Sequence, residues 1–241
     1  MDFSGRNAII TGAAMGIGFA TARMIAKNGG NVLLVDINEQ LLSESVESLK
    51  EYGREVYGYV CDVANEERVN SAAAFAAKKF GKIDILINNA GVYKDTYGIL
   101  FENSDSSMWK RKIDINILGT LYFTRAVING MLERGYGRIV NLSSVAGVYG
   151  IVSMADYSMS KGAILGFTKA LAKEVSERGV TVNAVSPGGI NDDLKANAQL
   201  SFMNRSGSND ECANLICFLA DESAAYISGV NYIIDGCRKK M

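Results

Sequence analysis

Seven short apolar runs, rich in valine and isoleucine, recur along this chain and alternate with longer amphipathic stretches. The runs are NAIIT (7–11), NVLLVD (31–36), REVYGYVCD (54–62), DILIN (84–88), GRIVNLS (137–143), VTVNAVS (180–186) and VNYIID (230–235), and amphipathic stretches such as 38–52 and 65–80 separate them. Strands that alternate with helices predict right-handed crossovers and a parallel sheet covered on both faces. Strands that are continuously apolar agree with burial on both faces. We therefore predict an α/β fold with a doubly wound, mainly parallel sheet of seven strands.

The chain gives no sign of a domain boundary. Its 241 residues suit one large α/β domain or two small ones, but they contain a single proline, Pro187, and no repeat, low-complexity tract or linker. We expect one domain over residues 1–241.

Charge and apolar segments exclude several classes of function. The 25 basic residues nearly balance the 26 acidic ones, so nucleic acid and membrane surfaces are not expected partners. No apolar run is long enough to span a bilayer, and the start of the chain shows no signal peptide, so we expect a cytoplasmic protein. The four cysteines form no Cys-x-x-Cys pair and the chain has no histidine. These features favour reduced thiols over a disulfide scaffold, and no metal site is expected.

Three glycines follow the first strand directly. Gly12, Gly16 and Gly18 lie between the strand 7–11 and a helix expected from about 16 to 28. Glycine permits a tight turn and lets backbone amides approach a pyrophosphate at the positive helix N-terminus. A glycine cluster is often only a turn, and the spacing differs from Gly-x-Gly-x-x-Gly. The position between strand and helix favours a dinucleotide site in a Rossmann-type domain.

An acidic residue, Asp36, ends the second strand. A carboxylate there can accept hydrogen bonds from the ribose hydroxyls of adenosine and would repel a 2′-phosphate. The neighbouring Met15 and Ile37 offer no cation for such a phosphate. The alternative role is an N-cap for the helix after it, which Asn38 could also supply, and both roles are compatible. The sequence favours NAD over NADP.

Because histidine is absent, acid–base chemistry needs another group whose pKa approaches neutrality. The stretch YSMSK (157–161) places Tyr157 and Lys161 one helical turn apart, where an ammonium can lower the pKa of a tyrosine. Such a pair also occurs by chance on the surfaces of many helices.

Seven motifs in order give the chain a resemblance over nearly its whole length. They are Thr11 to Gly18, Cys61-Asp62-Val63, Asn88-Asn89-Ala90-Gly91, Asn116, Ser143-Ser144, Tyr157-x-x-x-Lys161 and Pro187-Gly188. With them the chain resembles the classical short-chain dehydrogenases/reductases.

The resemblance implies a role for each matching residue. Tyr157 would be the catalytic acid/base and Lys161 the cation that lowers its pKa. Ser144, rather than Ser143, would bind the substrate oxygen, and Asn116 would hold a water in a proton relay with Lys161. Asp62 and Val63 would border the adenine, Asn89 and Gly91 the adenosine side of the cofactor, and Ile190 the nicotinamide carboxamide. The full set of cofactor positions is Gly12, Met15, Gly16, Ile17, Gly18, Asp36, Ile37, Asp62, Val63, Asn89, Gly91, Tyr157, Lys161, Pro187, Gly188 and Ile190.

One segment departs from the family pattern. Asp192 stands where relatives usually have threonine. A carboxylate at this position would repel a nearby pyrophosphate, because both are negatively charged. The stretch from Pro187 to Arg205 is also short, so we expect a short substrate lid at about 189–204. This segment is either a mobile lid or a shortened surface loop without a role in the mechanism, and the sequence supports both interpretations.

Together these features predict an NAD-dependent oxidoreductase that interconverts a secondary alcohol and its ketone. A 3-oxoacyl-thioester reductase is the alternative within enzymes, although Asp36 argues against it, and a non-catalytic dinucleotide sensor is the alternative outside them. The residues expected to shape the pocket are Tyr93, Tyr97, Phe101, Tyr149, Met154 and the loop 191–204. Their aromatic and aliphatic side chains predict a fairly apolar or cyclic alcohol, such as a steroid. Relatives commonly assemble through two long helices, here about 105–133 and 155–177, and the C-terminal strand, which predicts a homotetramer.

Overall fold

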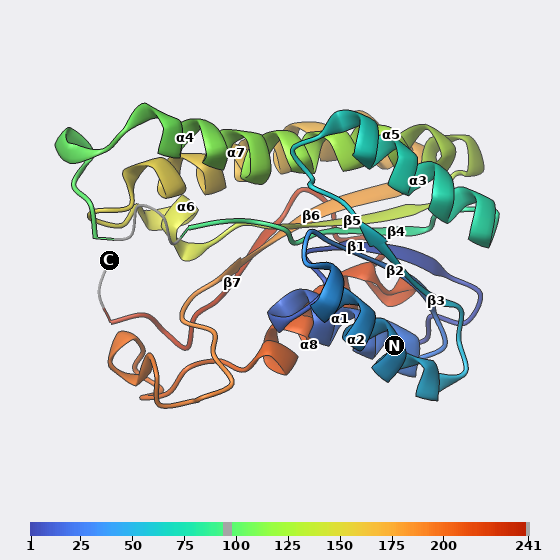
Figure 1. Cartoon of the computed structure of the whole chain (residues 1–241), viewed down its shortest axis with the longest axis horizontal. Coiled ribbons are helices and arrows are strands. Elements are labelled where there is room, and N and C mark those ends of the chain that lie inside the picture. Colours follow the sequence, from blue (N-terminus) through green and yellow to red (C-terminus); the bar gives the residue numbers. More distant parts are fainter. Residues whose placement is uncertain (94–97, 240–241) are drawn as a thin grey trace.

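The computed structural model describes residues 1–93 and 98–239, and its centre is one sheet of seven strands. All neighbouring strands run parallel, in the order β3-β2-β1-β4-β5-β6-β7 (Figure 1). The strands are β1 Asn7–Thr11, β2 Asn31–Asp36, β3 Val56–Val60, β4 Ile85–Asn88, β5 Gly137–Leu142, β6 Val180–Pro187 and β7 Asn231–Ile234. The predicted α/β fold is thus confirmed, and the sheet is wholly rather than mainly parallel.

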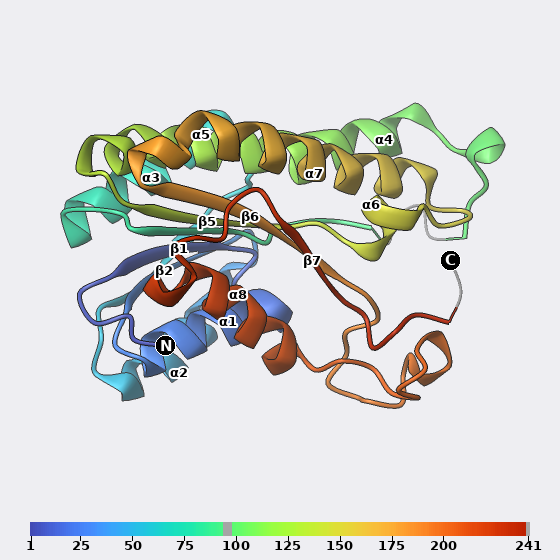
Figure 2. The ribbon, with the colours of Figure 1, turned by 180° about the vertical axis from the view of Figure 1, so that it is seen from behind.

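Helices cover both faces of the sheet, as the apolar strands require (Figures 1 and 2). One face carries α1 Gly16–Lys27, α2 Glu39–Leu49 and α8 Asn209–Ala220, and the other carries α3 Glu66–Phe80, α5 Gly119–Arg134 and α7 Ala155–Val175. Each face has its own core of buried aliphatic side chains. Several helices begin where a side chain accepts a backbone N–H: Asn38 caps α2, Asn65 caps α3, and Ser208 forms a capping box with Glu211 on α8.

The longest helical segment contains a change of winding at a site residue. Helix α4, Ser106–Lys112, passes through a π-helical segment, Ile113–Leu118, into α5, so that the chain is helical from 106 to 134. Asn116 lies in this π-helical segment and its side chain is buried. Segments of this kind occur mainly as single turns within α-helices and often at functional sites.

Shorter elements complete the chain. Helix α6, Val145–Tyr149, follows β5. Short 3₁₀ turns lie at Lys50–Tyr52, Phe101–Asn103, Ser176–Arg178, Ala198–Leu200 and Glu222–Ala224. In the described part of the chain no helix is both long and apolar enough to cross a membrane.

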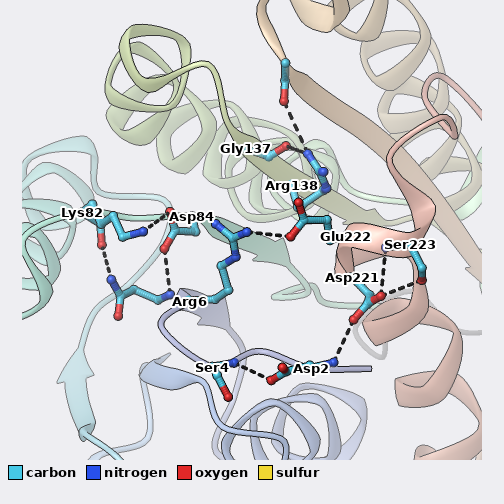
Figure 3. A network of polar contacts seen from close by, with 12 residues as sticks. Asp2, Ser4, Arg6, Lys82, Asp84, Gly137, Arg138, Asp221, Glu222 and Ser223 are labelled. Carbon is cyan, nitrogen blue, oxygen red and sulfur yellow. Dashed lines mark hydrogen bonds and ion pairs between the residues drawn. The ribbon is translucent and has the colours of Figure 1, made fainter.

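The amino ends of the strands are joined by a polar network (Figure 3). The Asp84 carboxylate, which is buried, accepts the backbone N–H of Asn7 at 3.1 Å and pairs with Lys82 at 3.3 Å. Arg6 pairs with Glu222 at 2.8 Å and thereby ties the start of β1 to the turn after α8. Side chains at the amino ends of the strands thus hold neighbouring elements together. The candidate site lies at the opposite, carboxyl ends.

Candidate active site

A cavity of about 430 Å³ opens at the carboxyl ends of β4, β5 and β6. This is the edge at which open parallel sheets bind ligands. Nine of the predicted site residues line it: Ile17, Asn89, Gly91, Ser144, Tyr157, Lys161, Pro187, Gly188 and Ile190. The other nine lie outside its lining: Gly12, Met15, Gly16, Gly18, Asp36, Ile37, Asp62, Val63 and Asn116.

The glycine-rich turn after β1 is packed too closely for side chains. A Cβ on Gly18 would lie 2.2 Å from the Gly12 carbonyl oxygen, and one on Gly12, whose φ is +62°, would lie 2.9 Å from the Ala90 Cα. Asn89 holds the turn from the end of β4 because its side-chain amide donates to the carbonyls of Thr11 and Gly12, each at 2.9 Å. The glycines therefore bring backbone, rather than side chains, to this corner of the site.

Helix α1 begins at this turn with free capacity for an anion. Its N-cap residue, Met15, makes no side-chain hydrogen bond to the first turn, and that turn contains no acidic residue. The N–H groups at a helix start carry partial positive charge and attract phosphate oxygens. These residues therefore fit the pyrophosphate of a dinucleotide.

The Asp36 carboxylate lies at the end of β2 beside the same turn. It accepts the backbone N–H groups of Ala14 and Asn38, each at 3.0 Å, while the side chain of Asn38 caps α2. The N-cap of α2 is thus Asn38 rather than Asp36, and the Asp36 carboxylate lies beside the glycine-rich turn. Met15 and Ile37 are exposed and bring no cation to this place.

Asp62 and Val63 differ in what they can offer a ligand. The Asp62 carboxylate accepts the N–H of Ala64 at 3.0 Å. The Val63 side chain is buried, and a Cβ on Gly119 would lie 2.7 Å from its Cγ2, so this side chain packs against the start of α5.

The predicted acid/base pair lies in α7 with both side chains turned into the fold. Lys161 is buried, its Nζ donates to the Leu142 carbonyl at 2.7 Å, and burial lowers the pKa of its ammonium to about 8. Burial raises the pKa of Tyr157, and hydrogen bonding by Ser144 acts in the opposite direction. The Lys161 Nζ lies 5.9 Å from the centroid of the Tyr157 ring. In this structure, desolvation of the phenol thus opposes the lowering of its pKa that the sequence predicts.

The two serines after β5 have different tasks. The Ser143 hydroxyl is buried and donates to the Lys161 carbonyl at 2.8 Å. The Ser144 hydroxyl caps α6 by accepting the N–H of Ala146 at 3.1 Å and also interacts with the Tyr157 phenol. Ser144 therefore remains the serine available to a substrate oxygen.

Asn116 is fully buried and joins the loop after β4 to α7. Its Oδ1 accepts the N–H of Val92 at 2.8 Å, and its Nδ2 donates to the Val92 carbonyl at 3.1 Å and to the Ser160 hydroxyl at 3.0 Å. A Cβ on Gly91 would lie 3.2 Å from both the Asn116 Oδ1 and the Lys161 Nζ. Gly91 accordingly lies beside the catalytic candidates, although the family pattern predicted it on the adenosine side.

The segment 189–204 is fastened at several points. Asn191 donates to the Gly207 carbonyl at 2.8 Å, and Ser206 donates to the Leu194 carbonyl at 2.7 Å. The Asp192 carboxylate accepts the backbone N–H of Asn209 at 3.3 Å and its side-chain amide at 2.8 Å. Asp192 therefore stabilises the first turn of α8, where a negative charge is favourable, and does not line the cavity.

Some of the residues expected to shape the pocket line the cavity, and others lie outside its lining. Tyr93 and Met154 line the cavity, and the Tyr93 ring lies 5.9 Å from that of Tyr157. Phe101 is exposed and stacks on Trp109 instead, Tyr149 is exposed and does not line the cavity, and Tyr97 lies outside the described residues.

Asn197 and Leu200, which belong to the loop expected at the pocket, do line the cavity. Sequence reasoning missed four lining residues: Leu142, Val145, Ile151 and Arg238. Arg238 lies after the last strand, where no motif marks it.

The whole chain is similar to known dehydrogenases and reductases. The family model for short chain dehydrogenase matches residues 6–201. A 3-oxoacyl-[acyl-carrier-protein] reductase of Synechocystis is 39% identical over 237 residues, which cover 95% of each chain. One from Thermotoga maritima is 34% identical, with 98% of each chain covered.

The chain is also similar to solved structures of dehydrogenases and reductases. NAD⁺-bound xylitol dehydrogenase is 32% identical with a TM-score of 0.91, covering 97% of this chain and 99% of the other. L-Sorbose reductase from Gluconobacter frateurii, complexed with NADPH and L-sorbose, is 30% identical with a TM-score of 0.92, covering 100% and 99%. Fold, site and sequence agree, and the chain belongs to the short-chain dehydrogenase/reductase family. It is an oxidoreductase of the kind that uses a nicotinamide dinucleotide.

Proposed function

We propose that this chain interconverts a secondary alcohol and its ketone with NAD as the preferred cofactor, and that Tyr157 is the acid/base. The observation that carries the proposal is the meeting of Ser144, Tyr157 and Lys161 at one cavity. A dinucleotide sensor would need the turn and Asp36 but not these three side chains at the same place.

Each of the three side chains has a task in such a reaction. The nicotinamide cofactor, when bound, takes up or supplies the hydride. Ser144 orients the substrate oxygen, and Tyr157 accepts the hydroxyl proton in oxidation or returns it in reduction. The Lys161 ammonium favours the ionised phenol by its charge, and it is held by the Leu142 carbonyl at 2.7 Å. Asn116 fixes the loop beside Lys161, and a water held there for a proton relay remains part of the proposal.

Two substrate classes are supported by different observations. The curated relatives favour a 3-oxoacyl compound, because those reported above are named 3-oxoacyl-[acyl-carrier-protein] reductases. A small apolar or cyclic alcohol is the second candidate, supported by the apolar side chains of Ile151, Met154 and Leu200 in the lining. We take a 3-oxoacyl compound as the leading substrate, which replaces the steroid-like alcohol in first place. The homotetramer expected from the family stays a prediction.

The test removes one oxygen atom. Tyr157→Phe should keep the fold and the affinity for NADH but lose about 10²- to 10⁴-fold in kcat, because a general acid–base group contributes that much. Oxidation of NADH and NADPH is followed with an acetoacetyl thioester and with a cyclic ketone, and NADH binding is measured by fluorescence. A variant that kept more than a tenth of the wild-type kcat would show that Tyr157 is not the acid/base.

A further inference from the structure

Arg238 reaches the candidate active site from the far end of the chain. It lies in the segment 236–239, after β7, and lines the same cavity as Ser144 and Tyr157. Backbone bonds fasten this segment to the turn at 200–203: Phe202 donates to the Cys237 carbonyl at 2.8 Å, and Lys239 donates to the Leu200 carbonyl at 2.9 Å. Ser201 and Arg238 form a β-bridge between these two bonds. The arginine is therefore held beside the cavity by the backbone on both sides of it.

The Arg238 Nε has no acceptor among the residues that the structure describes. This nitrogen is buried from solvent and makes no hydrogen bond within the structure, and no ion pair joins Arg238 to a carboxylate of the described residues. Arg238 as a whole is half-buried, but a buried donor such as its Nε is costly to leave without an acceptor. By contrast, the nearby Arg205 is paired with Glu211 through two hydrogen bonds of 2.8 Å and 2.6 Å. Arg238 thus differs from its neighbour Arg205 in having no carboxylate partner among the described residues.

The rest of the cavity lining is also suited to negative charge. Among the described lining residues the ionisable groups are Tyr93, Tyr157, Lys161 and Arg238, and none is Asp or Glu. Lys161 is hydrogen-bonded to the Leu142 carbonyl, so among the described lining residues Arg238 is the cation left for a ligand. A guanidinium presents a planar fork of donors that matches carboxylate and phosphate oxygens.

We propose that Arg238 binds an anionic group of the substrate, so that the site takes a 3-oxo or 3-hydroxy compound that carries a negative charge. The inference rests on the proposed function and narrows its substrate class. The charge has two possible sources: the carboxylate of a free 3-oxo acid, or a phosphate of the carrier to which a 3-oxoacyl thioester is attached. The sequence pointed to an apolar pocket because Arg238 is far from every motif.

The test measures binding without turnover. Calorimetric titrations of the NAD⁺ complex, in which a ketone cannot be reduced, compare acetoacetate with its uncharged methyl ester. They also compare acetoacetyl-CoA with the acetoacetyl thioester of N-acetylcysteamine, which lacks phosphate. We expect the charged member of at least one pair to bind more tightly, and Arg238→Gln to weaken that member by about 10- to 150-fold while leaving its uncharged partner unchanged.

Two further variants control for charge and local structure. Arg238→Lys should keep most of the preference, because it keeps the charge. Lys239→Gln removes a neighbouring cation that does not line the cavity, and it should change no affinity. Loss confined to acetoacetate places the anion on a free acid, and loss confined to acetoacetyl-CoA places it on the carrier. Equal affinity of both members in both pairs, or equal effects of Arg238→Gln and Lys239→Gln, would overturn the inference. Because no hydride is transferred, failure of the alcohol–ketone reaction would appear separately, in the Tyr157→Phe assay.

Discussion

At the scale of single residues, one carboxylate supports the glycine-rich turn and is expected to select the cofactor. Asp36 accepts N–H groups from Ala14 in the glycine-rich turn and from Asn38 at the start of the next helix. These bonds fix its position without neutralising its charge, and Met15 and Ile37 bring no cation beside it. A 2′-phosphate would therefore meet an uncompensated negative charge.

Asp36→Ala should weaken NAD⁺ and relieve repulsion of NADP⁺. A charge-assisted hydrogen bond contributes roughly 1.5–3 kcal/mol, so we expect NAD⁺ affinity to fall about 10- to 150-fold. Measurement of KM for NAD⁺ and for NADP⁺ in wild type and variant gives the ratio of the two KM values. General damage to the turn would raise KM for both cofactors together. A wild-type enzyme that used NADP⁺ as well as NAD⁺ would refute the role of Asp36.

At the scale of elements, a buried ion pair joins the helix that contains Asn116 to the helix that contains Tyr157. The Nζ of Lys112, the last residue of α4, lies 3.1 Å from the Asp156 Oδ2 on α7, and the two side chains are only 1% and 5% exposed. The Asp156 Oδ1 also accepts the backbone N–H of Tyr157 at 2.7 Å. The pair thus fixes how α4 and α7 meet next to Tyr157.

Asp156→Asn should destabilise the protein by about 3–5 kcal/mol, because it leaves the Lys112 ammonium buried without a carboxylate. Asparagine keeps an acceptor for the Tyr157 N–H, so the loss reports mainly on the charge. Urea unfolding of this variant is compared with that of Lys110→Met. Lys110 is an exposed lysine of α4, the helix of Lys112, and its replacement should change the free energy of unfolding little. The double variant Lys112→Met/Asp156→Asn should recover part of the loss, and a double variant as unstable as the sum of its parts would contradict the coupling.

At the scale of the whole molecule, the buried Lys161 makes stability depend on pH. Its pKa is about 8 in the folded chain against an ordinary value of 10.5. Below about pH 8 both states bind the proton and the folded state bears the full cost of the buried charge. Between about pH 8 and pH 10 the unfolded chain binds more protons, so stability should rise with pH. Above pH 10 the raised pKa of Tyr157 acts in the opposite direction, because the unfolded chain then loses its proton first.

Lys161→Met should therefore be more stable than wild type at pH 7, by about 3 kcal/mol, and the difference should shrink toward pH 10. Urea unfolding at several pH values measures this, and Lys169→Met, on the same helix, is the control. The stabilised variant should also have lost most of its kcat, since the cation beside Tyr157 is gone. A constant difference from pH 7 to pH 10 would mean that Lys161 does not titrate as its burial requires.

The sequence by itself determined the architecture and pointed to the residues of the proposed chemistry. Strand composition and alternation predict a covered parallel sheet, because local residues decide whether a segment can be buried on both faces. The glycine-rich turn and Tyr157-x-x-x-Lys161 carry their spacing within one short segment, so both were visible without the fold. The tertiary structure alone decided where the free charges lie. The interaction of Asp192 with Asn209, the pair of Lys112 with Asp156 and the arrival of Arg238 in the cavity all join residues distant in sequence. Such contacts depend on how strands and helices pack, and no local pattern records which cation is left without a partner.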